Sequence, residues 1–183
     1  DRLAETGNRF ETAYTACPLC TPTRASVMTG VHVHAHGMLT NVFEYGGCLP
    51  QIPDWPHLLP RRLADAGYRT GYVGKWHLGT KKCEWFGLKY EPVGPRDRGF
   101  EMIDLSHQEY LDEKGLEYEP RQTHAALKCS RFDGPPEASI SAYLMEQSFR
   151  LIDRYAESDE PFFLMHSDPG PHAGYVAPEE LYD

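Results

Sequence analysis

Two stretches of the chain carry apolar residues at helical spacing, and each is followed by a short apolar run. In His57–Ala66 the leucines and the last alanine share one side of a helix, and Gly67 is typical of a helix end. Tyr68–Val73 then has the apolar content and length of a short strand, which ends at the glycine-rich segment Gly74–Gly79. This region predicts a helix followed by a strand.

The second stretch, Ala138–Ala156, is the clearest helix of the chain. The apolar residues that share one of its faces are Ile140, Leu144, Leu151, Ile152 and Tyr155. A buried strand is predicted over Phe162–Met165, between Pro161 and the turn sequence Asp168-Pro169-Gly170. The repeated order of helix, strand and loop is the pattern of an α/β domain with a mainly parallel sheet.

The remaining segments give weaker signals. Leu3–Glu5 is typical of a helix end, and Arg9–Ala16 alternates as a short strand or extended segment does. A short helix is predicted over Arg24–Thr29, with a proline in its first turn and a glycine as its stop. We expect Val31–Pro56 to be loop. Residues 80–136 are predicted to be mostly irregular, with a strand near residues 99–105.

Composition and charge exclude several classes of function. The 183 residues, 40% of them hydrophobic, suffice for one domain with a real core. A formal net charge of -9 argues against nucleic-acid binding, which needs clustered Lys and Arg. We predict no membrane span, because no apolar run approaches the ~20 residues required. Five irregularly spaced cysteines argue against a full disulfide framework and leave the cellular location unknown.

Three constellations could carry chemistry. Cys20 precedes the predicted short helix and Arg24 lies one turn into it, so the helix end and the guanidinium both favour an anion there. Lys75 and His77 point the same way from a segment just after a predicted strand. His172 follows the second predicted strand. In α/β sheets ligands bind at the carboxyl ends of the strands, where the last two constellations lie.

Other features have simpler explanations. His32, His34 and His36 could form a metal-binding tract, but they also fit an ordinary loop. Cys17 and Cys20 have the spacing of a redox or zinc motif, yet Cys48, Cys83 and Cys129 supply no second pair for zinc. The tryptophans, Trp55, Trp76 and Trp85, are expected to pack rather than to stack on a nucleotide.

Taken together, the motifs resemble those of the sulfatase family. The signature Cys-x-Pro-x-Arg followed by Thr-Gly is matched by Cys20, Pro22, Arg24, Thr29 and Gly30, with Thr23 in place of the common serine. The segment from Gly74 to Gly79 resembles the family's Gly-Lys-x-His-x-Gly. Pro171-His172 resembles its Pro-His-x-Pro, although Gly174 replaces the second proline. The resemblance implies an alkaline-phosphatase-like α/β sandwich with a mainly parallel central sheet, incomplete in this chain.

The resemblance also implies a mechanism. A maturation enzyme oxidises Cys20 to formylglycine, and a hydroxyl of its hydrate attacks the sulfur of a sulfate ester. Lys75 and His172 hold the sulfate oxygens, while Arg24 and His77 position and polarise the diol. The second hydroxyl then loses its proton, sulfate leaves and the aldehyde is restored. A carbohydrate is one candidate substrate.

In the family a Ca²⁺ or another divalent cation binds the formylglycine and four acidic or amide side chains. Those partners are not found in residues 1–183, so residue 20 is the one ligand implied here. We therefore expect the chain to be part of a single sulfatase catalytic domain that lacks its first strand and C-terminal portion, and to be inactive alone. The alternatives are a phosphonate monoester or phosphodiester hydrolase of the same superfamily, a pseudo-enzyme with unmodified Cys20, and a thiol-redox or zinc module.

Overall fold

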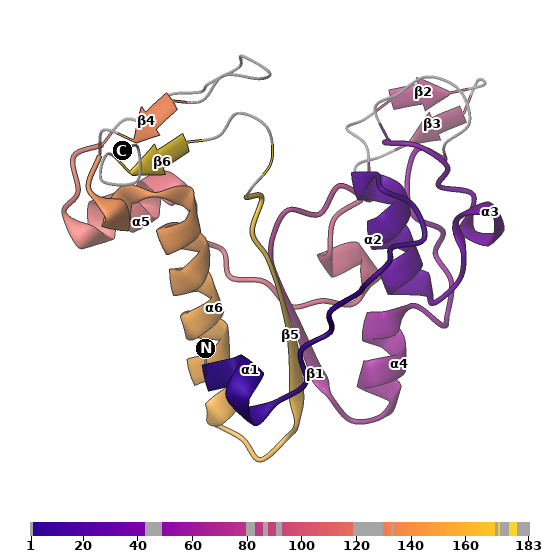
Figure 1. Cartoon of the computed structure of the whole chain (residues 1–183), viewed down its shortest axis with the longest axis horizontal. Helices are drawn as coiled ribbons and strands as arrows, with labels where there is room; N and C mark the ends of the chain where they lie inside the picture. Colours follow the sequence, from indigo (N-terminus) through magenta and orange to yellow (C-terminus); the bar gives the residue numbers. More distant parts are fainter. Residues whose placement is uncertain are drawn as a thin grey trace. The chain divides into compact units, whose positions relative to one another are not determined.

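The computed structural model describes residues 2–42, 49–79, 83–85, 88–90, 93–118, 130–132, 134–170, 172 and 176–178. The chain forms two compact units. The first comprises Asp1–Leu59 and His77–Val93, and the second comprises Pro60–Trp76 and Gly94–Asp183. Figure 1 shows the elements of both units along the chain.

The second unit is built on two parallel strands, β1 (Arg69–Gly74) and β5 (Phe162–Ser167). Their register runs from Arg69 opposite Phe162 to Gly74 opposite Ser167, so both strands end at the same edge. The long helix α6 (Ile140–Ala156) lies along both strands (Figure 1). This confirms the predicted order of helix and strand and the parallel pairing.

The core between α6 and the strands is formed by Val73, Leu144, Leu151 and Tyr155. At Gly71 a Cβ atom would lie 2.7 Å from the Tyr155 hydroxyl, so glycine leaves room for the end of this tyrosine side chain. On the other face of the strand, the Tyr72 ring packs against Trp76 and Phe100, with ring centroids 5.2 Å away in both cases. Trp76 is therefore a packing residue, as predicted.

The predicted apolar face of α6 is only partly right. Its three inner positions are buried, but Ile140 and Ile152 are 44% and 37% exposed. The buried face instead includes Gln147 and Ser148, whose burial depends on hydrogen bonds and not on hydrophobicity. Ser139 caps the helix, its hydroxyl accepting the Ala142 N–H at 3.1 Å, so α6 begins two residues later than predicted.

Strand β5 is not the buried strand that the sequence predicts. Phe162 is 41% exposed and the next three residues are half-buried. Among the described residues β5 pairs with β1 along one edge and packs on α6 with one face. An apolar run alone does not distinguish this half-covered strand from a fully covered one.

The region between residues 80 and 136 contains more structure than predicted. The described part holds β2 (Cys83–Trp85), β3 (Leu88–Tyr90), a 3₁₀ turn at Arg96–Arg98, helix α5 (His107–Lys114), β4 (Ser130–Phe132) and a second 3₁₀ turn at Pro136–Ala138. β2 and β3 pair antiparallel, and β4 pairs parallel with β6 (Val176–Pro178). The strand predicted near Gly99–Leu105 is reduced to one bridge between Glu101 and Gly71, since the following segment turns toward α5.

Helix α4 (Leu59–Asp65) leads into β1, two residues shorter at its start than predicted. Gly67 ends it with a φ of 85°, in the left-handed region that suits glycine. Helix and strand are thus joined by the stop that the sequence indicates.

In the first unit, α1 (Arg2–Thr6) and α2 (Cys20–Thr29) are the predicted helices, and α3 (Val33–His36) is a short addition in the expected loop. α2 begins at Cys20, four residues earlier than predicted, because a proline is tolerated in a first helical turn. The strand predicted over Arg9–Ala16 is not formed in the described chain. Its aromatic residues Phe10 and Tyr14 are 82% and 93% exposed, so the alternation of apolar and polar residues does not correspond to a buried face here.

Among the described residues, no helix combines the length and apolar character required to cross a membrane.

Candidate active site

Cys20 is the first residue of helix α2 and is half-buried. Arg24 follows one turn later on the same side of the helix, also half-buried. The helix begins without a side-chain cap, since Leu19 occupies the N-cap position, so the positive end of the helix is directed at the region of Cys20. This local geometry favours an anion next to residue 20.

Thr21 fixes this first helical turn to a distant part of the chain. Its buried hydroxyl donates to the His77 carbonyl at 2.8 Å and accepts the Val42 N–H at 3.4 Å. The Thr21 N–H donates to the Asn41 side-chain oxygen at 3.2 Å. Thr21 directly follows Cys20, so this bond links the start of the helix to the His77 backbone. Motif reasoning missed Thr21, since it occupies a variable position of the signature and only its burial reveals its role.

His77 has a backbone φ of 55°, which is uncommon for a residue other than glycine. The next residue, Leu78, is fully buried and its carbonyl accepts the Ile52 N–H at 2.7 Å. At Gly79 a Cβ atom would lie 2.1 Å from the Val93 carbonyl oxygen, so this close approach requires glycine. Such a conformation persists when its surroundings determine it, and residues held this way cluster at functional sites.

Lys75 follows the last residue of β1, and hydrogen bonds to its backbone N–H and carbonyl hold it in place. Its N–H donates to the Ser167 carbonyl at 2.8 Å, and its carbonyl accepts the Tyr72 hydroxyl at 2.6 Å and the Ser167 hydroxyl at 3.0 Å. Gly74, with a φ of 93°, allows this turn, because a Cβ there would lie 2.2 Å from the Ser167 carbonyl oxygen. The lysine side chain therefore starts from a rigid point at the strand end.

His172 lies in the loop after β5 and is exposed. Its N–H donates to the Pro169 carbonyl at 3.1 Å, and Asp168 accepts the Gly170 N–H at 2.7 Å. The turn that follows the strand is thus formed by the residues that predict it. Pro171 and Gly174, the other members of that motif, lie outside the described residues.

The structure accordingly sorts the predicted site residues into two groups. Cys20, Arg24 and His77 belong to the first unit, and Lys75 and His172 belong to the second, at the shared edge where β1 and β5 end.

His36 has a structural role. Its ring Nδ1 accepts the Met38 N–H at 3.1 Å, so Nε2 carries the proton and donates to the Ser26 hydroxyl at 3.0 Å. Burial lowers the pKa of His36, in keeping with a neutral ring. His32 and His34 stack on each other, with ring centroids 6.1 Å apart. The alternative of a histidine metal tract finds no support in these contacts.

The described cysteines and tryptophans form neither a disulfide nor a metal site. Cys17 and Cys20 are not joined in a disulfide. The side chains of Cys48, Cys83, Cys129 and Trp85 lie outside the described residues. The Trp55 ring stacks on His57 at 5.0 Å. Within the part of the chain that the structure describes, no three His, Cys, Asp or Glu side chains gather as a metal site would need.

Helix N-termini bind anions, and the carboxyl ends of parallel strands are where α/β proteins bind ligands, so both groups of residues lie at places that suit an anionic ligand. The chain belongs to the sulfatase family, since the family model described as Sulfatase matches residues 1–183. The N-acetylgalactosamine-6-sulfatase of Homo sapiens is 31% identical over 202 residues, which cover 97% of this chain and 35% of that protein.

A second relative is the uncharacterized sulfatase YidJ of Escherichia coli (strain K12), 29% identical over 194 residues, which cover 100% of this chain and 35% of that protein. The chain therefore spans about a third of the length of the curated relatives it matches. Among solved structures it is similar to Ps i-CgsB, with a TM-score of 0.63, 24% identity, and coverage of 94% of this chain and 39% of that one. The predicted alkaline-phosphatase-like α/β fold, incomplete in this chain, is confirmed.

Proposed function

We propose that the protein to which this chain belongs hydrolyses sulfate esters, with a formylglycine formed from Cys20 as its nucleophile. The observation that carries the proposal is the hydrogen bond of 2.8 Å from Thr21 to the His77 carbonyl. It holds the start of helix α2 against His77, and Lys75 lies two residues earlier in the chain. The Thr21 side chain, next to Cys20 in the family's cysteine signature, is thereby joined to the backbone of its Lys-x-His segment.

The proposed roles follow from what each side chain can supply. The hydrated aldehyde at position 20 supplies a hydroxyl that forms a bond to sulfur while the ester oxygen leaves with the alcohol. Arg24 and His77 orient that residue. Lys75 adds a fixed positive charge, and His172 a hydrogen-bond donor, to the sulfate oxygens where negative charge grows. Sulfate is released when the remaining hydroxyl of residue 20 loses its proton and the aldehyde forms again.

A carbohydrate sulfate ester is the substrate class that the relatives favour. Several of them are named N-acetylgalactosamine-6-sulfatase or N-acetylglucosamine-6-sulfatase, at 27–31% identity. We further propose that residues 1–183 form part of a single catalytic domain, and that a maturation enzyme modifies Cys20.

A divalent cation such as Ca²⁺ would stabilise the charge of the bound sulfate. Such an ion takes six to eight oxygen ligands, and the described residues do not fit it, because no three acidic, His or Cys side chains come together there. We expect its ligands, apart from residue 20, to come from the rest of the protein.

The test uses the whole protein and compares its two neighbouring cysteines. Mass spectrometry of the peptide with Cys20 should show the loss of mass that conversion of the thiol to an aldehyde produces. Turnover of p-nitrophenyl sulfate should fall at least about 1,000-fold in Cys20→Ala, since the nucleophile is lost. Cys17→Ser is the matched control, because Cys17 is equally half-buried and outside the signature.

Each result separates the alternatives. An unmodified Cys20 in active protein, or equal activity in Cys20→Ala and wild type, would contradict the proposal. Faster turnover of p-nitrophenyl phosphate or a phosphonate monoester would favour the phosphoryl hydrolase. Loss of activity in Cys17→Ser together with retention in Cys20→Ala would favour a thiol function of Cys17.

A further inference from the structure

An open groove of about 720 Å³ lies in the second unit, with Gly74 and Lys75 at one side of it. Its other lining residues come from the first half of α6, from the segment Met102–Ser106, from Glu109 of α5, and from Pro169 after β5. The groove thus begins at the shared edge where β1 and β5 end. Its volume is in the range of pockets that hold small organic ligands. None of the roles proposed above, apart from that of Lys75, uses it.

The lining of the groove is of two kinds. Ile103, Leu105, Ile140 and Leu144 form an apolar part, while Asp104 and Gln147 add carboxylate and amide groups. Leu144 and Gln147 are 6% and 5% exposed, so this part of the lining is firmly packed. A sugar ring presents C–H groups on its faces and hydroxyls at its edge, and both kinds of surface find a counterpart here.

Two carboxylates bound the groove. Asp104 pairs with Arg96 at 2.6 Å, which offsets its charge. Glu109 accepts the Ser106 N–H at 2.7 Å, and this bond lowers the pKa of the Glu109 carboxyl, so it is ionised at neutral pH. Within the described residues its partner in this bond, Ser106, is neutral, so the charge of Glu109 is not offset as that of Asp104 is by Arg96. A ligand with a further sulfate or carboxylate near Glu109 would meet like charge.

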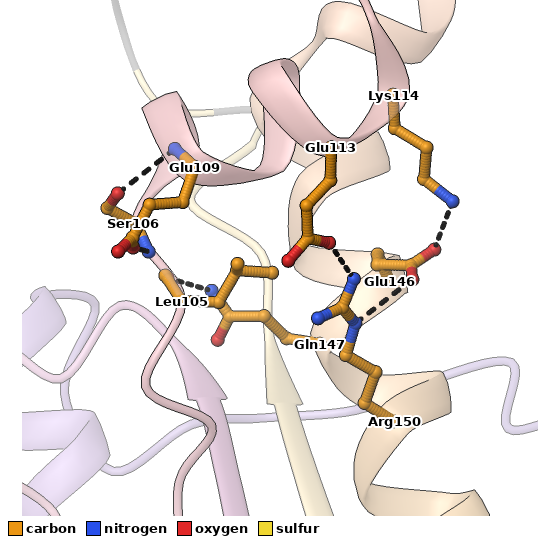
Figure 2. A network of polar contacts seen from close by, with 8 residues as sticks. All are labelled: Leu105, Ser106, Glu109, Glu113, Lys114, Glu146, Gln147 and Arg150. Carbon is orange, nitrogen blue, oxygen red and sulfur yellow. Dashed lines mark hydrogen bonds and ion pairs between the residues drawn. The ribbon is translucent and has the colours of Figure 1, made fainter.

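The groove wall is held by hydrogen bonds and ion pairs that Figure 2 shows. The Leu105 carbonyl accepts the Tyr143 hydroxyl and, at 3.4 Å, the Gln147 amide. Ser106 begins α5 with a capping box to Glu109, so the chain turns from the groove wall directly into a capped helix.

Helix α5 is in turn clamped to α6. Arg150 pairs with both Glu113 and Glu146, and Lys114 pairs with Glu146 at 3.1 Å (Figure 2). These groups are partly exposed, so each pair contributes little by itself, but the network joins two helices at several points. A wall fixed in this way loses little freedom when a ligand binds.

We propose that this groove binds an uncharged sugar ring, the alcohol part of the sulfate ester, and disfavours sugars that carry a second anionic group. The inference rests on the proposed function, in which Lys75 holds the sulfate. The sulfate would lie at the strand ends and the ring would extend from it over Ile140 and the Met102–Ser106 wall.

The chain offers a matched pair of variants on α6. Ile140 lines the groove and is 44% exposed, whereas Ile152 is 37% exposed and does not line it. In the whole protein, Ile140→Trp should fill the groove. We expect the ratio of kcat/KM for galactose 6-sulfate to that for p-nitrophenyl sulfate to fall about tenfold. Ile152→Trp should leave this ratio unchanged.

The exclusion of a second anionic group is tested with Glu109→Gln. This variant removes the charge and keeps a residue that can complete the capping box. We expect this change to raise kcat/KM for galactose 2,6-disulfate, relative to galactose 6-sulfate, by about threefold. An unchanged relative kcat/KM for the disulfate would overturn the exclusion of a second anion.

A binding measurement separates failure of the groove from failure of the proposed function. Saturation-transfer NMR with galactose should give a signal in wild type and Ile152→Trp and none in Ile140→Trp. That result without turnover of any sulfate ester would refute the sulfatase function and leave the sugar groove standing. Turnover with the same ratio in both tryptophan variants, or no galactose signal in wild type, would refute the groove.

Discussion

Two segments of the candidate site are held in place by different means. Lys75 is held by backbone groups at the end of a paired strand, with Ser167 as donor and acceptor. The start of helix α2 is held by side-chain hydrogen bonds, among them the bond from the buried Thr21 hydroxyl to the carbonyl of the strained residue His77. The strand end should therefore be sensitive to added atoms, and the helix start to the loss of one hydroxyl.

The largest effect is expected from an added methyl group at the strand end. Gly74→Ala places a Cβ atom 2.2 Å from the Ser167 carbonyl at a φ of 93°, so backbone must shift. We predict a loss of about 3–5 kcal/mol in the free energy of unfolding of the whole protein, measured in urea. The control is Gly30→Ala, where the φ is 71° and an added Cβ would meet open space. Its expected loss in the free energy of unfolding is about 1–2 kcal/mol. Equal losses would mean that the strand end is not constrained in this way.

Removal of the Thr21 hydroxyl should have the next largest effect. Thr21→Val keeps the shape of the side chain but removes the donor to the His77 carbonyl, so the free energy of unfolding should fall by about 1–3 kcal/mol. Because residue 20 would also move, kcat/KM should fall about tenfold. Thr29→Val is the comparison, because that buried hydroxyl donates within its own helix, to the Ala25 carbonyl at 2.7 Å. Thr29→Val should affect stability alone. A normal kcat/KM in Thr21→Val would show that the bond positions nothing of importance.

A smaller effect is expected from Tyr72→Phe, which deletes one of the bonds to Lys75. The Lys75 carbonyl still accepts the Ser167 hydroxyl at 3.0 Å, so the loss should be about 1 kcal/mol. In the double variant Tyr72→Phe/Ser167→Ala, the loss in the free energy of unfolding should exceed the sum of the two single losses. Both hydroxyls that donate to the Lys75 carbonyl are then missing. Strict additivity in urea unfolding would contradict this account of the strand end.

The smallest effect is a dependence of stability on pH through His36. Since burial lowers the pKa of His36 in the folded protein, the unfolded chain takes up the proton first. Stability from this residue is complete above its ordinary pKa of about 6.5 and decreases as the pH falls below that value. His36→Asn should weaken the dependence in urea unfolding between pH 5 and 7, by about 1 kcal/mol or less. An unchanged dependence would assign it to other groups.

The elements that hold the strand end were largely predictable from the sequence. Helix α6 and strands β1 and β5 follow from apolar spacing and their glycine and proline stops. The predicted buried face of α6 differs from the observed one, because Gln147 and Ser148 are buried with hydrogen bonds, which no hydrophobic pattern reveals. Helix α5 was missed although Ser106 and Glu109 form a capping-box pair, a signal that could have identified it.

The residues that hold the helix start were predictable only in part. The cysteine signature identifies Cys20 and Arg24, but the Thr21 bond does not follow from a pattern along the chain, because it joins residues 56 apart. The strand expected at Arg9–Ala16 failed for a similar reason, since alternation predicts a strand only where a neighbour buries one face.

The central claim is that both groups of residues act on one sulfate, and a crystal structure of the whole protein tests it most directly. The Cys20→Ala variant would be crystallised with galactose 6-sulfate, so that the ester is not consumed. We predict a sulfate whose oxygens lie within hydrogen-bond distance of both Lys75 Nζ and the His172 ring, with residue 20 facing its sulfur. A sulfate bound by one of these two side chains alone, or away from residue 20, would contradict the account.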